Sequence, residues 1–455
     1  MKDGRTEDRP DAVPAAASHA GEARARWAWV EPSVWTPRML GTLETGVKGG
    51  RWYSLFDKVY KEANLRAAYR KVAANKGAPG VDHVTTKRFG QRLDQEIASL
   101  QEDLRTARYR PSAIRRVEIP KPGRPGEFRP LGIPTVRDRV VQTALRNVLE
   151  PIFEAGFAEH SYGFRPGRSA KDALRRVEKL IDDGLAFVVD ADIKGYFDAI
   201  PHAKLLDRVR EKVTDGAVLA LLDAYLTQRI LDGLKEWTPV GGTPQGAVIS
   251  PLLANAYLDP LDHRVARRFE MVRYADDFVI LCRTRGEAQA ALDEVREWMA
   301  EAGLTLHPDK TRLVDLSARE TFDFLGYTLG RGVRRPSKRS LTRLRDAIRL
   351  HTPRTAGKSL ANVITPLNRT LRGWFQYFKH AKRTLLKELD GWIRTRLRGI
   401  LWRQAKRRGL VPKTANYRWP NAYFDRAGLF SLARARTEAV RVRYAGRPPT
   451  GEPCA

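Results

Sequence analysis

Two adjacent acidic residues interrupt an apolar segment in the second half of the chain. Residues 271–282 read Met-Val-Arg-Tyr-Ala-Asp-Asp-Phe-Val-Ile-Leu-Cys, so Asp276 and Asp277 stand between two short runs of strand-forming side chains. This pattern predicts a β-hairpin that carries both carboxylates at its tip. Acids at a tight turn can have a structural role alone. Carboxylate oxygens are also the ligands that Mg²⁺ prefers in proteins, and the segment by itself leaves both interpretations open.

A second acidic segment lies upstream. Residues 187–198 run from an apolar strand through Asp190 and Asp192 into a turn with glycine and aromatic residues. If this strand lies beside the hairpin, Asp192 faces Asp276 and Asp277 across the sheet. Carboxylates at that distance repel one another, so a divalent cation is their natural complement. Two Mg²⁺ ions held in this way can catalyse in-line nucleotidyl transfer.

The charge of the chain is concentrated at one end. Its 82 Lys and Arg exceed its 53 Asp and Glu by 29. Residues 331–455 hold 31 of these basic side chains and only 6 acidic ones, a net charge of +25, whereas residues 1–330 carry only +4. Such an excess favours a polyanionic partner, with nucleic acid first and an anionic membrane surface second.

Composition narrows the possible classes of protein further. No apolar run reaches the ~18 residues of a membrane span, so we expect no membrane-spanning segment. We expect no membrane among the partners. Only two cysteines are present, Cys282 and Cys454. This number argues against a disulfide framework and against a zinc site built from cysteine pairs. The simplest expectation is a reducing, cytoplasmic location, in the bacterial cytosol or nucleoid.

Hydrophobic periodicity indicates how the chain is organised. We expect a partly disordered N-terminal extension at residues 1–50 and a helical segment at residues 51–100. A mixed segment of helices and strands should follow at residues 101–330, and a basic helical domain with a tail at residues 331–455. Ser169 and Asp172 form a predicted capping box. Apolar residues at helical spacing predict helices over 52–75, 170–181, 288–302, 360–378 and 385–401.

The acidic segments resemble the palm motifs of a reverse transcriptase, and Tyr-Ala-Asp-Asp at 274–277 matches that family's signature. The resemblance extends over about residues 35–445 and is to group II intron-encoded reverse transcriptase/maturase proteins, in their short form without an HNH endonuclease domain. Further motifs follow in the family's order: 129–134, 137–142, 161–166, 242–251, 307–311, 324–326, 371–378, 419–424 and 428–431. It implies an α+β right-hand polymerase, with antiparallel sheet in its fingers and palm, followed by an α-helical thumb/maturase domain.

The resemblance also implies site residues. The catalytic carboxylates would be Asp192, Asp276 and Asp277, which would hold two Mg²⁺ ions, or Mn²⁺, together with the carbonyl of Ile193. Asp190 is the alternative at the first position. Residues implied to contact the nucleotide, template or primer are Lys121, Arg129, Phe197, Gln245, Gly246 and Lys310. Phe197 would be a steric gate against the ribose 2′-hydroxyl. Lys310 can equally be interpreted as a solvated lysine of a loop. Basic residues expected to contact RNA are Arg394, Arg398, Arg403, Lys406, Arg407 and Arg408.

By resemblance the chain is an RNA-directed DNA polymerase that copies an intron RNA into DNA at a target primer. It would also be a maturase that binds its group II intron RNA and assists splicing. The implied partners are that RNA, an RNA template with a DNA primer, and dNTPs, and DNA cleavage is not expected. Two alternatives remain: a host-adopted reverse transcriptase, and a non-enzymatic maturase or RNA chaperone with a vestigial polymerase site. The complete acidic set argues against the second.

Overall fold

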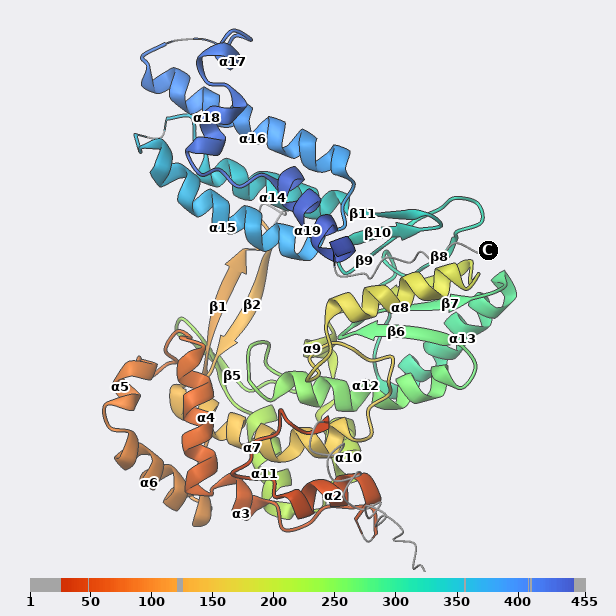
Figure 1. Cartoon of the computed structure of the whole chain (residues 1–455). Coiled ribbons are helices and arrows are strands. Elements are labelled where there is room, and N and C mark those ends of the chain that lie inside the picture. Colours follow the sequence, from red (N-terminus) through yellow and green to blue (C-terminus); the bar gives the residue numbers. More distant parts are fainter. Residues whose placement is uncertain are drawn as a thin grey trace, which may run out of the picture. The chain divides into compact units, whose positions relative to one another are not determined.

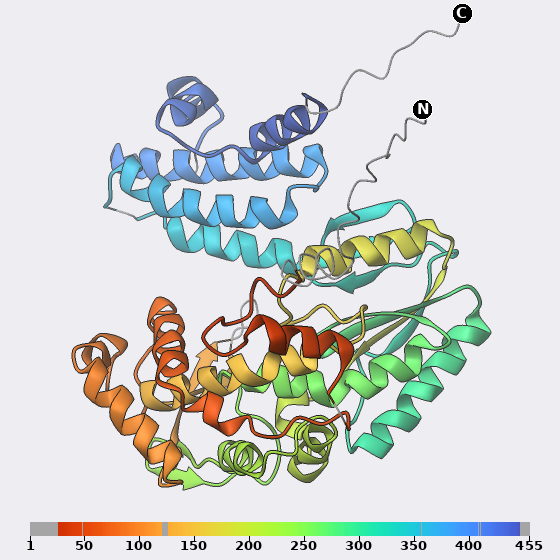
Figure 2. The same ribbon diagram turned by 60° about the horizontal axis from the view of Figure 1, so that its bottom comes forward.

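The computed structural model describes residues 26–445 except Lys48, residues 121–125, Ala356, Arg408 and Leu410. The chain divides into two compact units. The first comprises residues 1–119 and 128–314, and the second comprises residues 120–127 and 315–455. Figures 1 and 2 show the elements of both from two directions.

The N-terminal part of the first unit is helical. Its helices are α2 (Pro37–Thr45), α3 (Phe56–Val59), α4 (Glu62–Ala74), α5 (Thr86–Gly90) and α6 (Leu93–Arg105). α4 packs against α7 (Val136–Glu154), which is buried along most of its length and begins at the capping side chain of Thr135. Gly80 follows α4, and a Cβ there would lie 2.7 Å from the backbone of Thr135, so this turn requires glycine.

The helix predicted over 52–75 is two helices, α3 and α4. The chain leaves the helical conformation at Lys61, where ψ is 127°. α3 is fixed by a distant residue, because the backbone N–H groups of Leu55 and Phe56 donate to Asp215 Oδ2 at 2.7 and 2.9 Å. This contact spans about 160 residues of sequence, so no local pattern could indicate it.

A four-stranded sheet lies at the centre of the first unit, with strand order β6-β7-β3-β8. Its strands are β3 (Phe187–Asp192), β6 (Glu270–Tyr274), β7 (Asp277–Cys282) and β8 (Arg312–Asp315). Helices α8 (Ala170–Asp182), α12 (Ser250–Ala266) and α13 (Arg285–Ala302) pack against these strands. The predicted capping box of Ser169 and Asp172 is present at the start of α8.

A second four-stranded sheet has the order β2-β1-β4-β5. It contains β1 (Ile114–Pro120), β2 (Phe128–Ile133), β4 (Ile230–Asp232) and β5 (Lys235–Trp237). β1 and β4 run parallel, with Ile114 opposite Ile230. Three helices lie between β3 and β4 in the sequence: α9 (Tyr196–Ala199), α10 (His202–Arg210) and α11 (Gly216–Leu226).

The second unit has its own small sheet and helical core. Strands β9 (Phe322–Phe324), β10 (Tyr327–Gly330) and β11 (Val333–Pro336) form an antiparallel sheet. The helices are α14 (Lys338–His351), α15 (Leu360–Phe378), α16 (Arg383–Gln404), α17 (Ala415–Arg418), α18 (Asn421–Arg426) and α19 (Leu432–Ala445). Tyr327 joins sheet to helix, since its hydroxyl donates to the carbonyl of Tyr377 at 2.7 Å. These elements confirm the α+β class. None of the helices in the described part of the chain is long and apolar enough to span a bilayer.

Candidate active site

The two acidic segments meet in the β6-β7-β3-β8 sheet. β7 begins at Asp277, which pairs with Tyr274 of β6 on one side and with Asp192 of β3 on the other. The hairpin turn is therefore Ala275 and Asp276. Because opposite residues of antiparallel strands place their side chains on the same face, the register brings the Asp192 and Asp277 carboxylates together beside Asp276.

The carboxylates disfavour one another's ionisation. Burial first, and then the charges of Asp190, Asp192 and Asp276, raise the pKa of Asp277 to about 8. Burial also raises the pKa of Asp276, with the charge of Asp192 contributing. A cation that approached these oxygens would reverse the effect, since opposite charge favours the ionised form.

Two basic side chains already neutralise part of this cluster. Lys310 Nζ lies 2.8 Å from Asp192 Oδ2, and Arg312 Nε lies 3.1 Å from Asp190 Oδ2. Asp190 and Asp192 are thus each paired with one cationic side chain. The strand register distinguishes them, since Asp192 lies opposite Asp277 whereas Asp190 lies opposite Val279.

The oxygen atoms of Asp192, Asp276 and Ile193 fit a hard divalent cation by their chemistry. Among the described residues, no group of three His, Cys, Asp or Glu side chains is already arranged as a metal site. One oxygen of Asp192, Oδ2, accepts a hydrogen bond from the Lys310 ammonium at 2.8 Å.

The hairpin tip has a strained backbone that neighbouring residues hold in place. Ala275 adopts φ of +61°, which is uncommon for a residue with a Cβ. Gly163 packs directly against it, and a Cβ at Gly163 would lie 2.3 Å from the Ala275 nitrogen. The same loop pairs with β6 through the Tyr162 N–H, which donates to the Arg273 carbonyl at 2.9 Å. The 161–166 motif thus supports the hairpin.

Sequence analysis missed the buried pair of Arg273 and Asp262 beneath this tip. Each side chain is only 1% exposed. Arg273 Nε and Nη2 both donate to the Asp262 carboxylate, the former at 2.6 Å. Its other donors reach Ala275 O at 2.9 Å, Asn255 Oδ1 at 3.1 Å and Ser161 Oγ at 2.8 Å. All five N–H groups of the guanidinium are used. An arginine inside the apolar 271–282 run was the available signal.

Arg273 connects the buried pair to the hairpin turn through one contact. It donates to the carbonyl of Ala275, the residue with positive φ that directly precedes Asp276. A buried carbonyl without a partner costs free energy. The donation therefore stabilises the one backbone conformation that presents Asp276.

Phe197 lies on the turn that follows β3. Gly195 starts that turn with φ of +57°, and the Phe197 carbonyl accepts from the Thr243 N–H at 2.6 Å. A Cβ at Gly242 would meet that same carbonyl at 2.7 Å, so the 242–246 loop packs closely on the turn. The Phe197 ring is partly buried and meets Phe164 edge to face, with the ring centroids 6.4 Å apart.

The 242–246 loop also holds strand β2. The Gly132 N–H donates to the Gln245 carbonyl at 2.6 Å, and a Cβ at Gly246 would lie 2.4 Å from the Gly132 carbonyl. The Gln245 side chain donates to Asp198 Oδ2 at 3.1 Å. Arg129 is exposed on β2, three residues before Gly132. Lys121 lies outside the described residues.

The basic residues predicted to contact RNA lie on α16 and directly after it, and they divide into two sets. Arg398 is buried and donates to the Trp419 carbonyl and to Asn421 Oδ1, both at 2.9 Å, and Arg394 lies 3.4 Å from Asp425. These two arginines hold the 419–425 segment against α16, and the Arg398 guanidinium is thereby engaged within the protein. The exposed set is Arg403, Lys406 and Arg407, and Arg408 falls outside the described residues.

Residues 119–329 match the family model of the reverse transcriptase (RNA-dependent DNA polymerase), and residues 341–419 match the group II intron, maturase-specific domain. Protein YkfC of Escherichia coli strain K12 is 32% identical over 347 residues, which cover 67% of this chain and 86% of YkfC. Group II intron-encoded protein LtrA of Lactococcus lactis subsp. cremoris is 37% identical over 197 residues, which are 43% of this chain but only 32% of LtrA.

A solved chain from a "Partial Cas6-RT-Cas1--Cas2 complex" is 27% identical, with a TM-score of 0.36, and the match covers 54% of this chain and 41% of that one. The family models follow the order of the structure, with the first covering the acidic sheet and the second the helices from α14 to α17. The chain belongs to the group II intron-encoded reverse transcriptases, in which an RNA-directed DNA polymerase domain is followed by a maturase-specific domain.

Proposed function

We propose that this enzyme extends a DNA primer on an RNA template with dNTPs, using two Mg²⁺ ions at Asp192, Asp276 and Asp277. The carrying observation is the strand register that sets Asp192 opposite Asp277 beside the hairpin tip. When bound, the ions would activate the attacking primer hydroxyl and stabilise the leaving pyrophosphate. The RNA template in the cell would be the group II intron itself, copied at a target primer.

The chain's own residues would do the remaining work. Asp192, Asp276 and the Ile193 carbonyl would hold the ions. Asp277 would lie behind these direct ligands and act on the ions through its charge. Arg129 would hold the triphosphate by its forked donors, while Gln245 and Gly246 would line the nucleotide and template. Lys310, once separated from Asp192, would reach the primer end or the nucleotide.

Primer extension tests this proposal directly. The purified full chain, an RNA template annealed to a DNA primer, dNTPs and Mg²⁺ should give DNA products, and chelation of the metal should abolish them. The absence of extension with both Mg²⁺ and Mn²⁺ would overturn the polymerase assignment and favour a maturase without catalysis. Whether the gene lies inside a foldable intron RNA separates an intron enzyme from a host-adopted one.

Phe197→Ala is expected to admit ribonucleotides. The ring lies on the turn after β3 next to the proposed nucleotide site, and its removal would open space for the ribose 2′-hydroxyl. We expect the ratio of kcat/KM for a dNTP over the matching rNTP to fall about tenfold or more. Phe164→Ala, which removes the neighbouring ring but leaves the gate, serves as the control. An unchanged ratio in Phe197→Ala would assign this ring to core packing.

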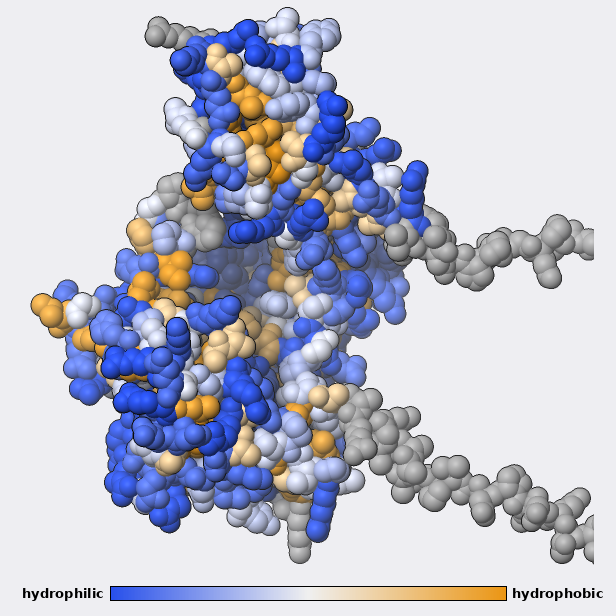
Figure 3. All heavy atoms as spheres, turned by 60° about the vertical axis from the view of Figure 1, so that its left-hand side comes forward, coloured by the Kyte–Doolittle hydropathy of each residue, from blue (hydrophilic) through white to orange (hydrophobic). Residues whose placement is uncertain are grey.

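We also propose that the basic helical unit binds the intron RNA through exposed side chains on and after α16. Arg403, Lys406 and Arg407 support this, and the Arg407 guanidinium lies 4.8 Å from the centroid of the Trp402 ring. Figure 3 shows hydrophilic residues around one hydrophobic patch on this helical unit. Cationic groups beside aromatic rings suit a polyphosphate that also exposes bases.

Replacing Arg403, Lys406 and Arg407 together by glutamine should reduce the salt dependence of RNA binding. Each lost phosphate contact lowers the slope of log K against log salt by about 1, so we expect a reduction of about 3. Filter binding at several NaCl concentrations measures the slope. Arg105→Gln, an exposed arginine paired with Glu102 in the first unit, is the control. A slope equal to that of the wild type would exclude this surface.

A further inference from the structure

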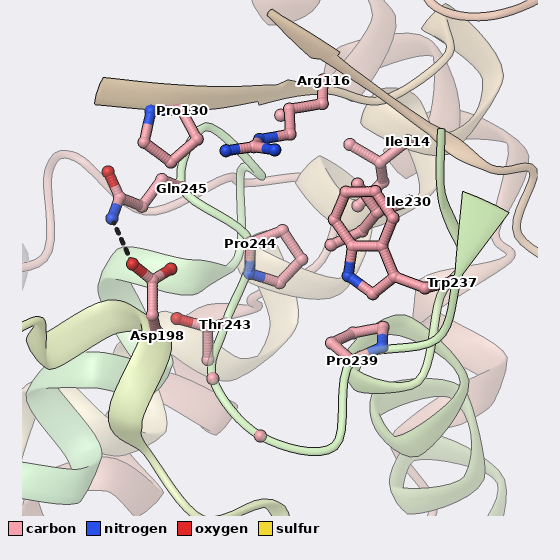
Figure 4. A pocket seen from close by; sticks show the side chains of 13 residues that line it. Ile114, Arg116, Pro130, Asp198, Ile230, Trp237, Pro239, Thr243, Pro244 and Gln245 are labelled. Carbon is pink, nitrogen blue, oxygen red and sulfur yellow. Dashed lines mark hydrogen bonds between the residues drawn. The ribbon is translucent and has the colours of Figure 1, made fainter. Parts of the chain in front are cut away.

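A pocket of about 330 Å³ lies between the β2-β1-β4-β5 sheet and the 239–245 loop. Its volume falls within the ~300–1,000 Å³ of sites that hold small ligands. Figure 4 shows Trp237 at one end of it, Asp198 with Gln245 at the other, and Arg116 reaching in from β1. Apolar residues supply most of the remaining lining: Ile114, Pro130, Ile230, Pro239 and Pro244.

The pocket borders the proposed nucleotide site through three separate elements. On β2 it is lined by Pro130 and Gly132, and strand alternation turns the intervening side chain, together with Arg129, to the other face. On α9 it is lined by Asp198, which directly follows Phe197. On the 242–246 loop it is lined by Gln245 itself. A ligand in the pocket would thus be an immediate neighbour of the incoming nucleotide and its partner base.

The polar groups of the pocket suit a planar heterocycle better than a phosphate. Asp198 supplies an acceptor at one end. Arg116 supplies donors: its Nη1 binds Asp232 at 2.9 Å, and its guanidinium carbon lies 5.8 Å from the centroid of the Trp237 ring. A phosphate here would face the carboxylate of Asp198 and be repelled. A nucleobase carries both donors and acceptors, and its flat face can stack on an aromatic ring.

We propose that this pocket receives the base of the unpaired template nucleotide that follows the one being copied. The inference rests on the proposed function, because it takes Phe197 and Gln245 to flank the incoming nucleotide. The templating base pairs with that nucleotide, so the next template base is one step further along the strand. Trp237 is 39% exposed and offers that base an aromatic ring to stack on, beside the Arg116 guanidinium.

The test compares two template–primer duplexes, one with a single unpaired template nucleotide and one with two. We expect the wild-type chain to insert the first dNTP with a kcat/KM about fivefold or more higher on the second duplex, because only there is a base available for stacking. Trp237→Ala should lower that ratio to about 1 without changing kcat/KM on the first duplex. Trp237→Phe, which keeps an aromatic face, should retain most of the advantage.

A binding measurement without dNTP separates this inference from the polymerase proposal. With 2-aminopurine as the second unpaired base, binding of the wild type should quench its fluorescence, and Trp237→Ala should remove the quenching. Tyr53→Ala, which removes a 68% exposed aromatic elsewhere in the same unit, should behave as the wild type. Quenching or a duplex preference that survives in Trp237→Ala would overturn the pocket's role, whereas loss of all extension would overturn the polymerase proposal alone.

Discussion

Asp276→Ala is expected to lower the rate of primer extension by about 10³-fold or more, because metal ligation contributes several kcal/mol to the transition state and each 1.36 kcal/mol is tenfold. Asp276 forms the hairpin tip next to Asp277, which pairs with Asp192. RNA affinity should remain within about twofold of the wild type, since the substitution leaves every phosphate-binding side chain in place.

Asp190→Asn is the matched control for this loss. Asp190 lies on the same strand as Asp192 but two residues further from the hairpin tip, opposite Val279. We therefore expect it to keep most of the activity, and single-nucleotide insertion kinetics for both variants will measure the difference. Near-normal extension by Asp276→Ala would refute the assignment of the hairpin acids. A loss in Asp190→Asn as large as that in Asp276→Ala would show that the metal site includes Asp190.

The second large effect should come from the buried pair of Arg273 and Asp262. Arg273→Met leaves the Asp262 carboxylate buried without its partner, and breaking such a pair costs about 3–5 kcal/mol. We expect the denaturant midpoint of unfolding to fall and primer extension to fall with it. Chemical denaturation followed by tryptophan fluorescence measures the first effect.

The double variant Arg273→Met with Asp262→Leu separates stability from positioning. Replacing both members of a buried ion pair by apolar side chains is often neutral for stability, so the unfolding midpoint should largely recover. Polymerase activity should stay low, because the Ala275 carbonyl still lacks the Arg273 donor that holds its strained turn. Recovery of the rate together with stability would mean that the pair serves the fold alone.

Local patterns predicted those parts of the fold whose contacts lie close in sequence. The hairpin of β6 and β7 follows from alternating apolar runs around a two-residue turn. Helix α8 follows from its capping box and apolar stripe. α13, predicted over 288–302, begins at Arg285, three residues earlier, because Thr284 caps it.

Distant contacts account for the rest. The parallel pairing of Ile114 with Ile230 joins segments more than 100 residues apart, and no pattern within either strand indicates this pairing. Likewise, the stripe on α16 indicated one buried face. The 419–425 segment covers a second face of this helix. Arg398 there donates to the Trp419 carbonyl, and Arg394 lies near Asp425. At the active site the acids were visible from sequence, but the support from Arg273 and Gly163 depends on three-dimensional packing.

If the proposed divalent ion binds Asp192, it has to replace Lys310, which already forms an ion pair with that carboxylate. The apparent affinity for that ion would then include the free energy of breaking the pair. The residue at position 310 would therefore influence how much divalent metal primer extension requires.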